Sequence, residues 1–190
     1  MFIRTVDDGL EKLLRAELPL PDDLGDITFE APTSGWSAQL SRITVNLFLY
    51  DVARSELPSR SLTQRQETNG RPERRAPQPM IRLGYLVSAW AGSPRDEHQL
   101  LGEVISRLAP LASIPAAHLP ADIDSAVQLA LSTDEGNRLR EIWSAAGGQL
   151  KASFTLQITA AADTFEWRDQ APLVTRIEAL AAPKPGGQPG

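Results

Sequence analysis

Two long segments in which apolar side chains recur at every second position constrain the fold most. In residues 42–52 one face carries Ile43, Val45, Leu47 and Leu49, and the other carries Thr44, Asn46, Phe48 and Tyr50. In residues 80–90 the alternating apolar residues are Ile81, Leu83, Tyr85, Val87 and Ala89. A period of two residues is typical of β-strands. Because both faces of the first segment are largely apolar, we expect that strand to be central and covered on both sides.

Three other segments have the periodicity of amphipathic helices, and they cover residues 6–18, 97–109 and 134–146. Their apolar residues recur every three or four positions, which places them on one side of each helix. Leu101 and Trp143 lie on these apolar stripes, so we expect both side chains to be buried.

Capping residues mark the ends of these helices. The expected N-caps are Thr5, Asp96 and Ser132, whose side-chain oxygens can accept hydrogen bonds from the first free N–H groups. Gly147-Gly148 follows the third helix and is expected to end it in a left-handed conformation.

The order of the elements predicts the fold class. Alternating patterns predict further strands at 126–131 and 153–160, and weaker patterns favour strands at 27–29 and 173–180. Helices that are interspersed with strands along the chain indicate an α+β fold. We expect a single domain over residues 1–180, with a mixed, mostly antiparallel sheet flanked by helices. Residues 181–190 are rich in proline and glycine, so we expect a flexible tail.

Residues 54–79 lack any apolar periodicity and are expected to form a long, exposed, basic loop. Residues 54–80 hold six arginines against three glutamates, whereas the rest of the chain holds 13 basic and 21 acidic residues. Guanidinium groups suit bidentate contacts with other proteins. The candidate protein-interface residues are Arg54, Arg60, Arg65, Arg71, Arg74 and Arg75. The alternative is that this segment is a solvated insertion without a partner.

The composition also argues against several classes of function. A net charge of −5 disfavours nucleic-acid binding. The chain lacks cysteine and has only His98 and His118 as histidines, so neither a thiolate metal site nor a histidine cluster is expected. Phosphate-binding glycine loops and a nucleophile elbow are also absent from the sequence. We therefore predict no enzymatic activity, no cofactor and no metal, and the four tryptophans are too scattered along the chain to predict a stacking platform.

Membrane and secretory segments are not expected either. No apolar run in the sequence approaches 18 residues, and residues 1–18 lack the apolar core of a secretory signal. We therefore expect a cytoplasmic product without a membrane partner.

Four motifs in a fixed order resemble a known family. Residues 43–52 (Ile-Thr-Val-Asn-Leu-Phe-Leu-Tyr-Asp-Val) resemble its first strand, which an arginine-bearing loop follows. Residues 79–92 resemble its second strand, and residues 97–108 resemble the helix after that strand. Residues 138–148 resemble its tryptophan-serine-alanine helix. The family is the N-terminal domain of the tail-terminator, or cap, protein of phage-tail-like contractile injection systems. Asp51 departs from the basic or polar residue that is common in the family at that position.

The resemblance implies a non-enzymatic structural protein. Such caps form a six-membered ring on the distal end of an inner tube, stop its polymerisation and hold the last sheath ring. The implied partners are the chain itself as a homohexamer, a tube protein and a sheath protein, within a particle assembled in the cytoplasm and released on lysis. A second hypothesis from another class stays open, a small-molecule-binding or catalytic α+β domain whose site uses His98 and the arginine-rich loop.

Overall fold

The computed structural model describes residues 2–60, 63–66, 72–120, 123, 125–132, 136–162 and 168–169. Its centre is one five-stranded sheet in the order β1-β2-β5-β7-β6. The strands are β1 (Gly25–Thr28), β2 (Ile43–Arg54), β5 (Met80–Trp90), β6 (Gln128–Leu131) and β7 (Ser153–Ala161). Only β1 and β2 run parallel, and the other neighbours are antiparallel. The predicted α+β class and the mixed, mostly antiparallel sheet are confirmed.

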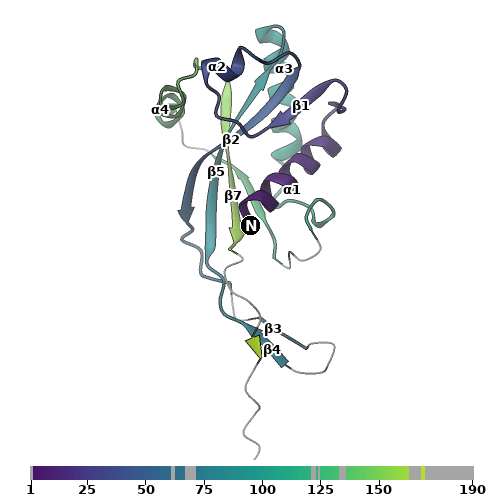
Figure 1. The fold of residues 1–190 in the computed structure, drawn as a ribbon, viewed down its shortest axis with the longest axis vertical. Helices are drawn as coiled ribbons and strands as arrows, with labels where there is room; N and C mark the ends of the chain where they lie inside the picture. Colours follow the sequence, from purple (N-terminus) through teal and green to yellow (C-terminus); the bar gives the residue numbers. More distant parts are fainter. Residues whose placement is uncertain are drawn as a thin grey trace, which may run out of the picture.

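Two long helices cover one face of the sheet (Figure 1). They are α1 (Phe2–Glu17) and α3 (Pro94–Leu108). Leu10, Leu13 and Leu14 of α1 are fully buried against strand residues such as Leu47 and Leu83. Leu101 on α3 is buried, as predicted.

Two of the predicted N-caps are wrong. The first helix begins at Phe2 rather than after Thr5, because Phe2 and Ile3 extend the apolar stripe and pack against the core. The N-cap of α3 is Ser93, whose hydroxyl oxygen accepts from the Asp96 N–H at 3.3 Å. Asp96 lies inside the helix and accepts a hydrogen bond from the Ser93 hydroxyl.

Three tryptophans that are far apart in sequence meet on the other face of the sheet. Trp36 lies in the short helix α2 (Ser34–Ser37), Trp90 ends β5, and Trp143 lies in α4 (Gly136–Ala146). Trp36 and Trp90 pack edge to face with centroids 5.3 Å apart, and Trp90 and Trp143 are 6.2 Å apart. The expectation of scattered tryptophans is therefore wrong for these three, while Trp167 is outside the described residues.

Polar groups hold this aromatic cluster in place. Trp143 is buried, as predicted, and its indole N–H donates to the Ser153 hydroxyl at 3.0 Å. The Lys151 ammonium lies 3.8 Å from the Trp90 ring centroid and also pairs with Glu97. Helix α4 is followed, as expected, by Gly147 in the left-handed conformation, with a φ of +71°. The predicted cap Ser132 precedes residues 133–135, which are outside the described part of the chain.

The segment expected to be one long loop contains a β-hairpin arm. It consists of β3 (Thr63–Gln66) and β4 (Pro72–Arg75), and β4 also pairs with β8 (Arg168–Asp169). An isolated bridge between Arg60 and Gln78 joins the arm to the strands that lead into it. Figure 1 shows the arm beyond the lower end of the central sheet, at the opposite end from α2 and α3. These strands are almost entirely polar, so apolar periodicity could not identify them.

Two predicted C-terminal features are not described by the structure. The strand predicted at 173–180 and the flexible tail at 181–190 both fall outside the described residues. Among the residues that are described, no helix is long and apolar enough to cross a membrane.

Among the described residues, one edge of β2 has no strand partner along most of its length. Strand β1 pairs only with Ile43–Asn46, and no described strand pairs with the same edge from Leu47 to Arg54. Residues 44–47 of β2 are buried, so both faces of the strand are covered there, as predicted. Ile43 at its start is 41% exposed and Val52 near its end is 53% exposed. The expectation of a strand covered on both sides therefore holds only for residues 44–47.

A buried hydrogen bond joins α1 to the sheet. The Tyr85 hydroxyl donates to an Asp7 carboxylate oxygen at 2.7 Å, and the Tyr85 side chain is fully buried. Burial, reinforced by the hydrogen bond and by the charge of Asp7, raises the pKa of Tyr85 above its ordinary value of 10.0. Burial also raises the pKa of Asp7, although the hydrogen bond from Tyr85 opposes that shift.

Removing the Trp143 side chain tests the aromatic cluster. We expect Trp143→Ala to lower the free energy of unfolding by about 3–5 kcal/mol, because it leaves a cavity and a Ser153 hydroxyl without its donor. The measurement is urea unfolding followed by circular dichroism. The matched control is Leu150→Ala, since Leu150 is 61% exposed and its loss should change stability by less than about 0.5 kcal/mol. Equal effects of the two substitutions would contradict this packing.

The buried tyrosine predicts how stability changes at alkaline pH. Above pH 10, the ordinary pKa of tyrosine, the unfolded chain releases the Tyr85 proton while the folded chain keeps it. The free energy of unfolding should therefore fall by up to about 1.4 kcal/mol per pH unit from this group alone. Denaturant unfolding between pH 7 and pH 11 should show a shallower decline above pH 10 for Tyr85→Phe than for the wild type. Parallel curves would show that Tyr85 ionises equally in both states.

Candidate functional site

A β-bulge places two adjacent side chains of β2 on the same face of the sheet. Leu49 pairs with Tyr85, but Asp51 pairs with Gly84, so Tyr50 is the extra residue. Strict alternation would put Tyr50 and Asp51 on opposite faces. The bulge brings both side chains to one pocket instead.

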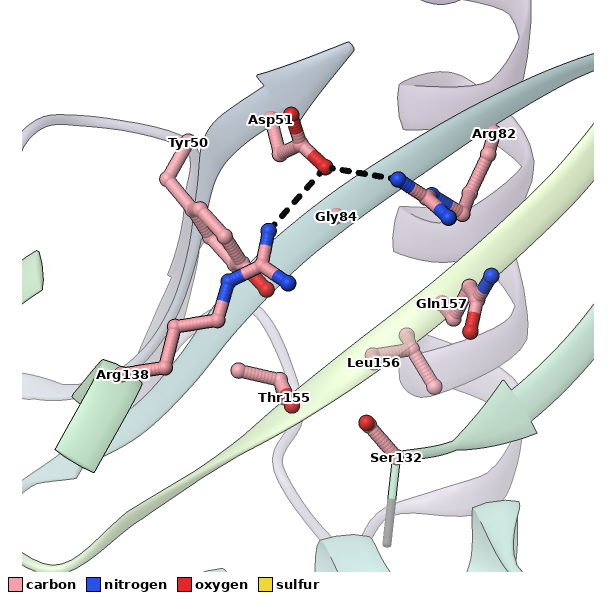
Figure 2. Close-up of a pocket in the computed structure, with 9 residues that line it drawn as sticks. All are labelled: Tyr50, Asp51, Arg82, Gly84, Ser132, Arg138, Thr155, Leu156 and Gln157. Atoms are coloured by element: carbon pink, nitrogen blue, oxygen red, sulfur yellow. Dashed lines mark hydrogen bonds and ion pairs between the residues drawn. The ribbon is translucent and has the colours of Figure 1, made fainter. Parts of the chain in front are cut away.

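The pocket lies on the sheet face opposite α1 and beside the start of α4 (Figure 2). Strands β2, β5 and β7 form its floor, and Arg138 of α4 and Ser132 after β6 form its sides. Its volume is about 200 Å³, and its lining residues are Tyr50, Asp51, Arg82, Gly84, Ser132, Arg138, Thr155, Leu156 and Gln157.

The Asp51 carboxylate lies between two arginines. Its Oδ2 atom is 3.2 Å from Arg138 Nη2 and 3.5 Å from Arg82 Nη2 (Figure 2). The Arg138 guanidinium also lies over the Tyr50 ring, 5.3 Å from its centroid, in a cation–π arrangement. These contacts connect α4 to β2 and orient both guanidinium groups.

The close approach of β2 favours glycine at position 84. A Cβ atom there would lie 3.1 Å from Tyr50 Cζ and 3.2 Å from Asp51 Cβ. A larger residue would therefore displace the Tyr50 ring, on which the position of Arg138 depends. In the sequence, a sign of this close approach is a glycine inside the alternating pattern of the strand.

The polar groups that line the pocket can bind a charged or hydrogen-bonding ligand. Its lining has two cationic groups, one carboxylate, three hydroxyl groups from Tyr50, Ser132 and Thr155, and the Gln157 amide, without a histidine among these residues. Within the described residues no group of three histidine, aspartate or glutamate side chains is placed to hold a metal ion.

The candidate arginines are spread along the arm and the strands leading to it, away from this pocket. Arg54 ends β2 and is exposed, and Arg60 pairs with Gln78. On the arm, the exposed Arg74 and the half-buried Arg75 belong to β4. The backbone of Arg65 pairs with Glu73, while Arg71 is outside the described residues.

The two parts of the alternative site are far apart. His98 is exposed on α3, and α3 lies at the opposite end of the molecule from the arm (Figure 1). The described arginines of the basic segment therefore form no site with His98 within one chain.

A double-mutant cycle tests the ion pair between α4 and β2. Because Asp51 and Arg138 are partly exposed, we expect Asp51→Asn and Arg138→Gln to show a coupling of about 0.5–1 kcal/mol at low salt. The coupling should shrink in high salt. The matched control is Arg140→Gln, an exposed arginine on the same helix, which should show no coupling with Asp51→Asn. Coupling above about 3 kcal/mol would instead indicate a fully desolvated pair.

Comparisons with known proteins agree with this architecture. Among curated proteins no sequence matches the chain. Two similar solved structures are a PVC sheath/tube terminator of an extracellular contractile injection system, in the extended state, and the tube-terminating cap of the anti-feeding prophage.

The similarity to both structures extends over nearly the whole of this chain. The first has a TM-score of 0.69 at 21% identity and covers 96% of this chain, and the second has 0.61 at 16% identity and covers 92%. The chain spans 64% and 60% of the lengths of those two proteins, less than two thirds of each. These likenesses show a shared fold. The Pvc16 N-terminal domain family matches residues 5–176, so the chain belongs to that family.

Proposed function

We propose that the chain is a structural, non-enzymatic terminator of a contractile injection system. In this role it forms a ring on the end of the inner tube, stops tube growth and anchors the last sheath ring. The observation that carries the proposal is membership of the Pvc16 N-terminal domain family over residues 5–176. The fold shared with two chains described as tube terminators supports it.

The arm and the charge distribution support a ring made of copies of this chain. A ring closes through contacts between two different surfaces of each subunit, so a projecting element that reaches a neighbour is suitable. The arm projects beyond the sheet, while 21 of the 24 acidic residues lie outside residues 54–80. A basic arm beside a largely acidic neighbouring body is electrostatically complementary. The proposed partners are five further copies, a tube protein and a sheath protein, without nucleic acid, membrane or cofactor.

Assembly in the cytoplasm into a phage-tail-like particle, with release on lysis, completes the proposed role. The alternative of a small-molecule-binding or catalytic domain is less favoured, because His98 and the arm lie at opposite ends of the molecule.

Light scattering of the purified chain tests the ring directly. We expect a species of six times the 20.7 kDa subunit, alone or in equilibrium with the monomer. Added to the tube protein of the same system, the chain should end tube growth and bind to tube ends in electron micrographs. A strictly monomeric chain that leaves tube length unchanged would contradict the proposal.

Charge reversal in the basic segment tests its role in assembly. We expect Arg54→Glu with Arg74→Glu to leave the melting temperature and far-ultraviolet spectrum nearly unchanged, since both side chains are exposed. The pair should weaken ring formation or tube-end binding, most strongly at low salt. The matched control is Arg95→Glu with Arg140→Glu, which reverses two exposed arginines on α3 and α4. If both pairs weaken assembly equally, net charge rather than the arm is responsible, and assembly unaffected at low salt would mark the segment as a solvated insertion.

A further inference from the structure

The pocket of Figure 2 has more hydrogen-bond donors than its own acceptors use. Thr155 is 3% exposed and lines the pocket, and its hydroxyl has no hydrogen-bond partner among the described residues. A buried hydroxyl that makes no hydrogen bond is destabilising unless another group supplies one. Thr155 is therefore an unexplained polar group in an otherwise well-packed sheet.

Most N–H donors of the two guanidinium groups also lack an acceptor within the described residues. Each has five N–H donors, but the only hydrogen bonds of Arg82 and Arg138 within the described residues are single contacts with Asp51. Those contacts, at 3.5 and 3.2 Å, are longer than the 2.7–2.9 Å typical of charge-assisted hydrogen bonds. Asp51 thus orients the two arginines without saturating them.

The charges in the pocket favour a ligand with a single negative charge. Two guanidinium groups and one carboxylate leave a formal charge of +1, which one further monoanion would neutralise. A planar carboxylate matches the fork of an arginine in two parallel hydrogen bonds. A dianionic phosphate would make the pocket net negative and would be repelled by Asp51.

Size and access agree with a carboxylate on a short apolar stem. The volume of about 200 Å³ admits a carboxylate with a few methylene groups, and the Tyr50 ring offers a wall for that stem. The Arg82 and Arg138 side chains are 37% and 47% exposed, so a ligand reaches them without opening the fold.

We propose that this pocket binds one carboxylate group through Arg82, Arg138 and Thr155, with Asp51 and Tyr50 as positioning residues. The carboxylate comes either from an acidic side chain of a neighbouring protein chain or from a free carboxylic acid. The first source rests on the proposed function, whereas the site itself does not.

Nuclear magnetic resonance titration of the isolated chain tests the site. At constant ionic strength, acetate and glutarate should shift the amide signals of Asp51, Arg82 and Thr155 in a saturable way, with dissociation constants in the millimolar range. Inorganic phosphate should bind more weakly. Failure of both carboxylates to produce saturable shifts at these residues would overturn the proposal.

Two variants separate binding from a purely structural role. Arg138→Gln should weaken glutarate binding by about tenfold or more, since it removes a charged donor. Thr155→Val should weaken it by about fivefold while melting at the same or a higher temperature, because it replaces an unsatisfied hydroxyl with a methyl group. The matched control Arg140→Gln should bind as the wild type does. Equal binding by all four proteins would show an adventitious ion effect and overturn the proposal.

Ring assembly then distinguishes the two sources of the carboxylate. If a neighbouring chain supplies it, Thr155→Val should weaken assembly and glutarate should compete with assembly of the wild type. If a free acid is the ligand, Thr155→Val should bind glutarate about fivefold more weakly while assembling normally. A wild-type chain that never assembles would refute the proposed function, but the titration of the isolated chain would still decide whether the pocket binds carboxylates.

Discussion

The antiparallel pairing of β2 with β5 is the constraint on which the rest of the structure depends. The pairing runs from Thr44–Trp90 at one end to Arg54–Ile81 at the other. The part of this pairing near Trp90 forms the floor under the tryptophan cluster and one wall of the leucine core. The part near Arg54 leads directly into the arm. The position of the arm is therefore set by the direction in which these two long strands leave the core. The single interruption of the pairing, at Tyr50, creates the pocket. One pair of strands therefore sets the positions of the core, the arm and the candidate binding site.

Much of the fold could be predicted because burial leaves a periodic pattern in the sequence. The strands β2, β5, β6 and β7 and the helices α1, α3 and α4 all have an apolar side facing the core, and they were predicted with shifted ends. The hairpin could not be predicted in this way, since Thr-Gln-Arg-Gln and Pro-Glu-Arg-Arg have no apolar alternation. Its strands are defined by backbone hydrogen bonds, which any polar sequence can make. The meeting of Trp36, Trp90 and Trp143 depends on tertiary packing across more than a hundred residues and has no local pattern.

The candidate site shows a sharper limit of sequence reasoning. The arginines of residues 54–75 stand out because charge is visible in composition, and six of them were assigned to a protein interface. The pocket cannot be predicted from the sequence pattern because it depends on a bulge. The bulge adds one residue to β2, so every later side chain lies on the opposite face from the one that strict alternation predicts. It also needs Arg138, which is 87 residues away from Asp51. Gly84 was the one local clue, since a glycine inside a strand often marks a close approach of another backbone or ring.

The bulge also affects whether another strand can pair with the edge of β2 that has no partner among the described strands. An unpaired strand edge is a template on which another chain can add a strand, and repeated addition leads to aggregation. In the proposed ring, copies of the chain would lie at a high local concentration, which increases that hazard. The extra residue at Tyr50 breaks the regular spacing of backbone donors and acceptors along Leu47–Arg54, and the exposed charge of Arg54 ends the stretch. A straight foreign strand can therefore match only a few residues on either side of the bulge. We therefore expect the irregularity that shapes the pocket to oppose the edge-to-edge addition of further strands to β2 as well.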